Sequence, residues 1–394
     1  MWTRRGAVRF VSGMANASFE TIDQYPALLA RLPPSLDLAE LARETRAFLR
    51  PRGVRSAQDL LRLILAWAVG GFSLQQVAAW AGEQGIAELT DEALIQRLHR
   101  SAAFVQAVAN AILKSVAQRP CWPGRVLRIA DSSSLSKPAS RGTDWRLHGV
   151  YDLARGGFTH LELTDSHGGE ALDRGAPVAG EIRISDRGFA NAQSWQRYLH
   201  PPCENQADVP RPADVPNRAD FIVRMRWNTV RLIDQAGKRF DLIGHLGKLP
   251  AASELHEVKV WAQSGKRQPA IPIRLVIWRK PAEVVVATQK RLRHQASRQQ
   301  SKLDDRSLTA AEFVILATSL PEAGFPAAEI LAVYRLRWQI ELAFKRLKSL
   351  LKIDKIRTRT EAGTRCWLYG QLTAALLCED LSQDVLESFP SGAF

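Results

Sequence analysis

The sequence predicts an α/β protein that carries an all-helical domain at its N-terminal end. Hydrophobic residues recur at helical spacing up to about residue 118, and strand-like runs replace them from residue 124. Two of these runs lead into an aspartate, Asp131 or Asp186, from which a side chain can reach a site at the edge of a sheet. The 54 Lys and Arg residues outnumber the 40 Asp and Glu residues, which gives a net charge of +14. Such an excess favours a polyanionic partner, nucleic acid ahead of an anionic membrane.

Composition narrows the class of protein further. A hydrophobic content of 46% and a charged content of 24% are ordinary for a globular chain of 394 residues. The four cysteines lack metal-ligand spacing, and no apolar run reaches the ~18 residues that span a bilayer. Residues 1–18 are expected to be disordered, and Arg9 interrupts the apolar run that an export signal would need. We therefore expect a cytoplasmic protein with no membrane partner.

Residues 19–118 are predicted to form a helical domain that binds DNA. Four segments show helical spacing: Leu38–Leu49, Leu60–Val69, Leu74–Ala81 and Ala103–Val116. Ser73 and Thr90 are predicted N-caps, and Gln76 completes a capping box with Ser73. The helices after these caps resemble a helix-turn-helix in which Asp91–Arg100 would be the recognition helix. A helical pair that only packs is the alternative, because the turn is longer than usual.

Residues 119–227 are predicted to form the first part of the α/β core. The predicted strands are Val126–Ala130, His148–Leu153, Phe158–Leu163, Glu181–Ser185 and Asp220–Trp227. The second and third of these form a predicted hairpin, and helices are predicted near residues 167–178 and at Asn191–Leu199. Asp131 directly follows the first strand and Asp186 the fourth. Either aspartate taken alone could simply begin a loop or cap a helix.

Residues 228–310 are predicted to be a β-rich insertion in this core. The sequence predicts a hairpin at Val230–Ile243 and strands at His256–Gln263, Ile271–Lys280 and Val284–Val286. A basic run that is predicted to be helical follows at Lys290–Lys302. Residues 311–394 are predicted to return to the core, with a strand at Phe313–Ala317, a long helix from about Ala327, and C-terminal helices.

The most informative pattern lies on that long helix. Positions i, i+3, i+7 and i+14 of one helical face hold Tyr334, Arg337, Glu341 and Lys348, with Trp338 and Lys345 beside them. The neighbouring face, from Leu336 to Leu351, is apolar and would pack against the core. One carboxylate among cations suits phosphodiester chemistry, in which a metal-binding acid works beside phosphate-binding bases. The alternative is a solvated helix with ordinary i,i+4 ion pairs around Glu341.

The spacing Y-x2-R-x3-E-x6-K resembles the YREK signature of the bacterial insertion-sequence DDE transposases. Asp131 resembles the first acid of that family's D-D-E triad, and the D-R-G of Asp186–Gly188 resembles the second. Trp145–Leu153 is similar to the family's core hairpin. The resemblance covers about residues 55–375. It implies a ribonuclease H-like catalytic core with a β-strand insertion between the second aspartate and the glutamate.

The resemblance also implies a role for each site residue. Asp131, Asp186 and Glu341 would be catalytic and would hold two Mg²⁺ or Mn²⁺ ions. Phosphates at the transposon end would be held by Tyr334, Arg337 and Lys348, with Trp338 and Lys345 nearby. Arg224 matches a DNA-contacting position, and Phe313 stands where relatives have a tryptophan that stacks on a flipped base. A basic run would line the DNA path, or would only form a solvated helix: Lys290, Arg291, Arg293, Arg298 and Lys302.

The implied function is that of a cut-and-paste DNA transposase, which cleaves at the inverted-repeat ends of its element and transfers them to target DNA. Its partners would be those ends, target DNA and a second copy of the chain, in a bacterial cytoplasm at the nucleoid. Arg337 and Lys348 are expected to face phosphates and to leave Glu341 free of ion pairs. Two other classes stay open: a ribonuclease H-like nuclease without strand transfer, and a non-catalytic DNA-binding regulator.

Overall fold

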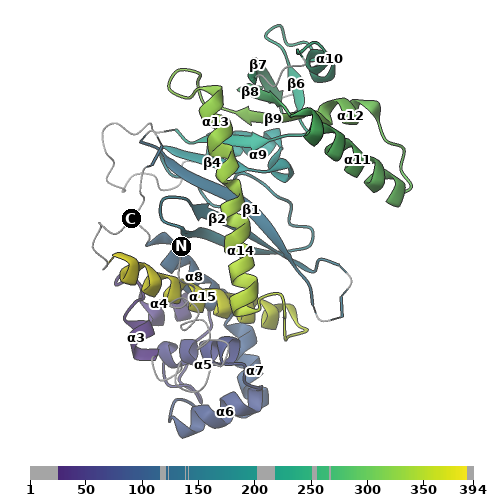
Figure 1. Cartoon of the computed structure of the whole chain (residues 1–394). Coiled ribbons are helices and arrows are strands. Elements are labelled where there is room, and N and C mark those ends of the chain that lie inside the picture. Colours follow the sequence, from purple (N-terminus) through teal and green to yellow (C-terminus); the bar gives the residue numbers. More distant parts are fainter. Residues whose placement is uncertain are drawn as a thin grey trace.

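The structure is a computed structural model that describes residues 25–115, 121–122, 124–137, 139–140, 142–201, 218–250, 255–265 and 268–387. A helical bundle lies at one end, and a mixed sheet extends away from it, crossed by one long helix (Figure 1). The prediction of disorder for residues 1–18 lies outside the described residues. Within the described ranges, every helix is too short or too polar to cross a bilayer.

The bundle contains the helices predicted for the N-terminal domain and one helix from the C-terminal part. These are α3 (Tyr25–Leu29), α4 (Leu38–Glu44), α5 (Ala57–Val69), α6 (Leu74–Glu83), α7 (Asp91–Arg100), α8 (Ala102–Lys114) and α15 (Glu361–Glu387). Ser73 Oγ accepts the Gln76 N–H while the Gln76 side chain accepts the Ser73 N–H, so the predicted capping box is confirmed. Thr90 caps α7 through the Ala93 N–H, which confirms the start of the predicted recognition helix.

All described strands belong to one nine-stranded sheet with the order β3-β2-β1-β4-β5-β9-β8-β7-β6. They are β1 (Val126–Leu135), β2 (Trp145–Asp152), β3 (Gly157–Asp165), β4 (Glu181–Ser185), β5 (Asp220–Arg224), β6 (Arg231–Ile233), β7 (Leu255–Gln263), β8 (Ile271–Arg279) and β9 (Phe313–Thr318). β1, β4 and β5 are parallel neighbours, and the other pairs are antiparallel. The mixed α/β class predicted from the sequence is confirmed.

Two hydrophobic cores cover the two faces of this sheet. Alternate residues of β5 enter different cores, because successive side chains of a strand point to opposite faces. Ile222 joins the core that contains Phe344 of α14 (Trp338–Leu351). Phe221 joins the other core, where its ring lies 4.8 Å from that of Trp195 in α9 (Ala192–Leu199). The helices α13 (Ala327–Tyr334) and α14 meet at the 3-10 turn η2 (Arg335–Arg337), and together they form the predicted long helix.

The C-terminal helix α15 fastens the bundle to the sheet. Gln371 donates its side-chain N–H to the Ala68 carbonyl of α5. The hydroxyl of Tyr369 accepts the backbone N–H of Leu163, in β3, at 3.1 Å. The sequence groups α15 with the catalytic core, whereas its contacts reach both parts of the molecule.

Within its described residues, the insertion predicted as β-rich contains at least as much helix as strand. Besides β6, β7 and β8 it holds α10 (Leu242–Gly247), α11 (Ala282–Arg298) and α12 (Asp305–Ala311). The predicted strand Val284–Val286 is part of α11. The predicted Val230–Ile243 hairpin is present in a short form, in which the Phe240 N–H donates to the Leu232 carbonyl of β6 and Ile233 bridges to Arg239. The strands β6 to β8 extend the core sheet through β9, because β8 pairs directly with that strand.

The helix predicted near residues 167–178 is absent, and a buried arginine explains why. Arg183 of β4 donates from Nη1 to three carbonyls of this segment, those of Leu172 at 2.7 Å, Arg174 at 2.9 Å and Gly175 at 3.0 Å. Carbonyls bound in this way are not available to the N–H groups of a helix. The guanidinium also pairs with Glu181 at 2.6 Å, and both side chains are almost fully buried. The segment is therefore a loop, here named the Arg183 loop (residues 166–180).

We expect Arg183→Ala to destabilise the protein by about 3–5 kcal/mol, because it leaves the buried Glu181 without this partner and frees the loop carbonyls. Thermal or denaturant unfolding measures the loss. The matched control is Lys259→Ala, which removes one partner of the exposed pair with Glu322 and should leave the unfolding transition in place. Equal stability of the two variants would contradict the structural role given to Arg183.

Candidate active site

Asp131 and Asp186 lie side by side because their strands are parallel neighbours. In the β1–β4 register Ala130 pairs with Ser185, and the two aspartates are the next residue along each chain. Neighbouring strands lie about 4.8 Å apart, so both carboxylates emerge at the same end of the strand pair. Asp186 directly follows β4, as predicted. Asp131 lies within β1, because the strand continues through the serine run to Leu135, and the prediction that it ends the strand is wrong.

A glycine lets the signature helix α14 approach these aspartates. Gly149 of β2 is the antiparallel partner of Asp131. A Cβ at Gly149 would lie 2.7 Å from the Phe158 ring and 2.9 Å from the Phe344 ring, so a side chain there would push α14 away. The rings of Phe158 and Phe344 lie 5.3 Å apart. The apolar face predicted for the helix therefore packs on the strand beside Asp131.

The guanidinium of Arg337 lies among three carboxylates. Its Nη2 donates to Glu341 Oε1 at 2.6 Å, and its Nη1 lies 3.5 Å from Asp131 Oδ2. Its charge also acts on Asp186. The expectation that Arg337 leaves Glu341 free of an ion pair is wrong for this structure, because the i,i+4 spacing brings the two side chains together.

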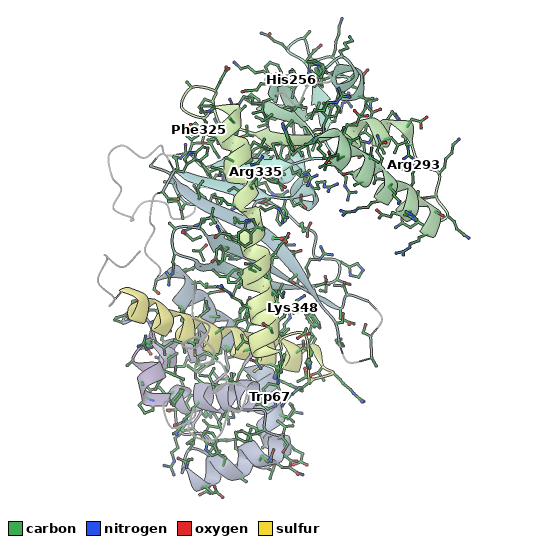
Figure 2. All side chains as sticks on the ribbon, in the orientation of Figure 1. Trp67, His256, Arg293, Phe325, Arg335 and Lys348 are labelled. Carbon is green, nitrogen blue, oxygen red and sulfur yellow. The ribbon has the colours of Figure 1, made fainter. Side chains whose placement is uncertain are left out.

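Tyr334 contacts the aspartate that follows β4, and Lys348 contacts β1. The hydroxyl of Tyr334 donates to Asp186 Oδ1 at 3.2 Å, and burial, with the Asp186 charge, raises the pKa of Tyr334 to about 12. Tyr334 is therefore a neutral donor at pH 7. Lys348, at the far end of α14 (Figure 2), donates from Nζ to the Ser134 carbonyl of β1 at 3.0 Å. The contacts of Tyr334, Arg337 and Lys348 are thus spread along β1, from the two aspartates to Ser134 near the end of the strand.

Burial and nearby charges shift the pKa values of the two aspartates in opposite directions. Burial raises the pKa of Asp131 to about 6, although the Ser132 N–H, which donates to Oδ1 at 2.8 Å, and the Arg337 charge oppose this. Burial acts on Asp186 in the same sense. There, however, a backbone N–H and the charges of Arg337 and Arg224 outweigh it and lower the pKa of the carboxyl below its usual value.

The residues fit a divalent cation in donor type and in charge. Carboxylate oxygens are the donors that Mg²⁺ and Mn²⁺ prefer, and the site offers them from β1, from the turn after β4 and from α14. In the described part of the chain, no three His, Cys, Asp or Glu side chains are grouped closely enough to hold a metal ion as they stand. The charge of Arg337 lies between the acids instead.

The four other predicted DNA contacts have different surroundings. Trp338 is 52% exposed, and Lys345 on the same helix is also exposed, so both can reach a ligand. Arg224 ends β5, beside β4 and Asp186. Phe313 is only 4% exposed, and the Arg279 guanidinium covers its ring at 5.3 Å. The Phe313 ring is therefore not accessible to a flipped base in this structure.

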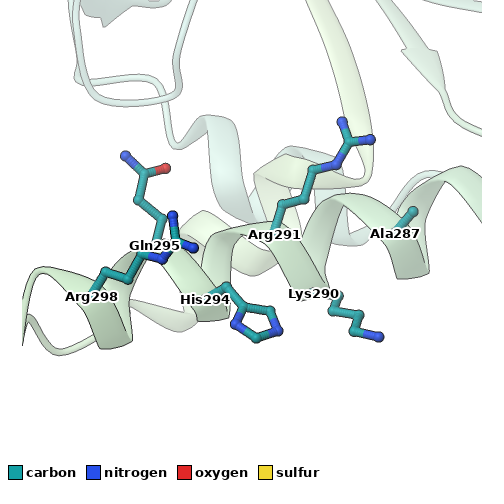
Figure 3. Close-up of a pocket in the computed structure, with 6 residues that line it drawn as sticks. All are labelled: Ala287, Lys290, Arg291, His294, Gln295 and Arg298. Carbon is teal, nitrogen blue, oxygen red and sulfur yellow. The ribbon is translucent and has the colours of Figure 1, made fainter.

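The predicted basic helix is confirmed as α11, and none of its residues is buried. It projects from the sheet as an arm, and Arg293 lies on the part of the helix that is away from the sheet (Figure 2). A shallow hollow along one side is lined by the side chains drawn in Figure 3: Ala287, Lys290, Arg291, His294, Gln295 and Arg298. Lys302 follows the helix and is exposed.

Sequence reasoning missed one acid of the site, Glu170. It lies in the Arg183 loop, and its Oε1 accepts the Ser132 hydroxyl at 2.6 Å, next to Asp131. No sequence signal marks it, because the contact depends on a fold that the segment adopts only around Arg183.

Comparison with known proteins decides the class. Residues 122–377, which include Asp131, Asp186 and Glu341, match the family described as Transposase DDE domain. The chain belongs to this family. It is 37% identical over 374 residues to the protein InsL of insertion sequence element IS186A from Escherichia coli strain K12, across 94% of this chain and 97% of the relative. It is also 37% identical over 375 residues to the transposase for insertion sequence element IS421 from Escherichia coli, with the same two coverages.

Among solved structures, a piggyBac transposase in a synaptic complex with hairpin DNA aligns with 94% of this chain and 86% of that chain, at 8% identity. The TM-score of 0.40 is too low to support an argument. The family and the curated relatives suffice: this DDE transposase is of the kind that bacterial insertion sequences encode, and it acts on DNA. Use of a divalent metal ion goes with membership of this family.

We expect Asp131→Asn to stabilise the metal-free DDE transposase at pH 8 and to have little effect near pH 4. A carboxyl whose folded pKa lies above its unfolded value is unfavourable once ionised, and that cost disappears as the pH falls from about 6 to below about 4. A rise in the pKa from 3.8 to about 6 corresponds to about 3 kcal/mol at most. Asp186→Asn should have the opposite sign, because the pKa of Asp186 is lowered. Thermal unfolding in EDTA at both pH values tests this, and a difference between variant and wild type that does not change with pH would contradict it.

Proposed function

We propose that this DDE transposase cleaves DNA at the inverted-repeat ends of its element and joins the freed ends to target DNA. The observation that carries the proposal is the position of Asp131, Asp186 and Glu341 around one cationic group, the Arg337 guanidinium. These acids come from distant parts of the chain, and only the fold brings them together. They would hold two Mg²⁺ or Mn²⁺ ions, which when bound activate the attacking oxygen and stabilise the leaving one.

The chemistry is two displacements at phosphorus. In the first, water attacks the phosphate at the transposon end, the bond to the 3′ oxygen breaks, and a 3′-OH is released. In the second, that hydroxyl attacks a target phosphate, a new phosphodiester bond forms, and a target 3′ oxygen leaves. Asp131, Asp186 and Glu341 serve both steps, and Tyr334 orients the Asp186 carboxylate through its hydroxyl.

Arg337 changes partners in this scheme. Without metal it neutralises Glu341 and Asp131. With divalent ions held by the acids, the Arg337 guanidinium would be free to bind a phosphate, for which its fork of N–H donors is well suited. Lys348, Lys345 and Trp338 on the same helix and Arg224 at the end of β5 would contact the same DNA end.

The exposed arm α11 would line the path of the DNA. Its basic residues lie on a helix with no buried side chain, so they lose little by turning toward phosphates. The α6–α7 pair in the bundle would contact DNA as a helix-turn-helix, which the caps and the bounds of α7 support.

The remaining details of the proposal concern fold and assembly. The core of β1 to β5 and β9 is proposed to be ribonuclease H-like, a proposal supported by family membership and by the mixed sheet with its central parallel strands. We propose a homodimer in the DNA complex, because an element has two ends that are processed together. The net charge of +14 supports a location at the bacterial nucleoid.

Replacing any one of Asp131, Asp186 and Glu341 by Ala should abolish cleavage and leave end binding largely intact. The matched control is Glu361→Ala, because Glu361 also pairs with an arginine four residues along its helix, on α15 and not on α14. Purified protein is incubated with Mg²⁺ and DNA that carries the flanking inverted repeats. Wild type should give joined products. Cut products without joined products would contradict strand transfer. A gel shift without cutting would contradict the catalytic assignment, and so would full cleavage by Glu341→Ala.

Arg337→Ala and Lys348→Ala should each weaken binding to a precut transposon end and reduce the salt slope by about one unit per lost phosphate contact. A matched α11 variant, Arg298→Ala, should show a similar reduction if the arm lines the DNA. Lys259→Ala is the neutral control, because this exposed lysine pairs with Glu322. Salt titrations in Mg²⁺ give the slopes. An unchanged slope for Arg337→Ala, together with a large loss of thermal stability, would mean that Arg337 serves only as a structural ion-pair partner.

A further inference from the structure

The Arg183 loop brings a fourth carboxylate to the two aspartate-bearing strands. The loop is anchored from both sides: Arg183 binds three of its carbonyls from β4, and Arg174 within it pairs with Glu162 of β3 at 2.8 Å. A loop fixed in this way holds its side chains in defined places. Glu170 is the one that points back toward the site.

Glu170 contacts the strand of Asp131 through Ser132. The Ser132 hydroxyl donates to Glu170 Oε1 at 2.6 Å, while the Ser132 N–H donates to Asp131 Oδ1 at 2.8 Å. One residue thus links the two carboxylates. Arg146 of β2, with its Nη1 3.5 Å from the same Oε1, keeps Glu170 in place.

Glu170 also contacts the turn of Asp186. A Cβ added to Gly188 would lie 1.4 Å from Glu170 Oε2, so the carboxylate rests directly against the backbone of this glycine. Gly188 is the last residue of the D-R-G that begins with Asp186. Any larger residue at position 188 would displace the Glu170 side chain, and this explains why the position is occupied by glycine.

We propose that Glu170 is a positioning residue that sets the spacing of Asp131 and Asp186 for the divalent ions. It acts through Ser132 on one strand and through Gly188 on the turn after the other, and not as a ligand of the ions. The inference rests on the proposed function, because it assumes that the two aspartates hold the ions. Groups that orient metal ligands typically change metal affinity about 10–100-fold when they are removed.

The hydrogen bond and the packing need the shape of Glu170 more than its charge. A glutamine side chain at this position would still present an oxygen to Ser132 and an amide group of the same size to Gly188. Glu170→Gln should therefore keep Mn²⁺ affinity within about threefold of wild type, whereas Glu170→Ala should lose about tenfold or more. Gly188→Ala displaces the same side chain and should match Glu170→Ala. Because both act on one contact, the double variant should lose little more than either alone.

Mn²⁺ titration of the DNA-free full-length protein measures these affinities, and cleavage rate and end binding are measured on the same samples. The matched control is Asp173→Ala, an acid of the same loop that pairs outward with Arg197 at 2.6 Å and should leave Mn²⁺ affinity unchanged. Thermal unfolding identifies any variant that fails to fold. If Glu170→Ala does not fold, the Mn²⁺ affinities of Glu170→Gln and Gly188→Ala still test the positioning role. Loss of cleavage with end binding unchanged is expected for Glu170→Ala.

Two results would overturn the inference. Wild-type Mn²⁺ affinity in Glu170→Ala would show that the spacing of Asp131 and Asp186 does not depend on Glu170. Equal losses of affinity in Glu170→Gln and Glu170→Ala would show that Glu170 acts on the ions through its charge. Asp186→Ala separates this from a failure of the proposed function. If that variant keeps wild-type Mn²⁺ affinity, the metal assignment itself is wrong. If it loses affinity while Glu170→Ala does not, only the positioning role is wrong.

Discussion

The convergence of three acids on the Arg337 guanidinium in a partly buried site is the constraint on which the rest of this structure depends. Two like charges about 5 Å apart repel by about 3 kcal/mol at an effective dielectric constant of about 20, so the folded chain must offset that repulsion. Arg337 contributes to this, with one N–H group toward Asp131 and another toward Glu341. The Ser132 and Arg187 backbone N–H groups and the Tyr334 hydroxyl also donate to the two aspartates. The signature residues are therefore part of what holds the metal-free site together, before any DNA arrives.

The same site depends on how closely backbone segments approach. Gly149 lets α14 lie against β2 opposite Asp131, and Gly188 lets Glu170 lie against the turn after Asp186. Neither glycine has a positive φ, so the absence of a side chain, not backbone freedom, is what each position needs. Close packing on both sides of the strand pair therefore holds Asp131 and Asp186 next to each other.

Local pattern predicted much of the fold, but not the contacts around the acids of the proposed triad. Helix bounds, the Ser73 cap and the strand before Asp186 were accessible because spacing and capping act within a few residues. The Arg183 loop was not, because its carbonyls bind a side chain on a later strand. Phe313 looked available because a sequence shows a residue type and not the Arg279 side chain above it. A helical wheel put Arg337 and Glu341 on one face but could not say whether the arginine turns toward the acid or toward solvent.

The ion pair between Arg337 and Glu341 also couples the two ligands of the proposed reaction. While Arg337 pairs with the acids, it is not available to bind a phosphate, and the acids are less available to bind a metal ion. In the proposed reaction, divalent ions held by the acids would leave Arg337 free for DNA, and by reciprocity a phosphate that draws Arg337 away would improve metal binding by the same factor. The raised pKa of Asp131 acts in the same direction, because a desolvated carboxylate gains most from a divalent cation at neutral pH. A site built in this way is less stable empty than it could be, which is the usual cost of assembling like charges for catalysis.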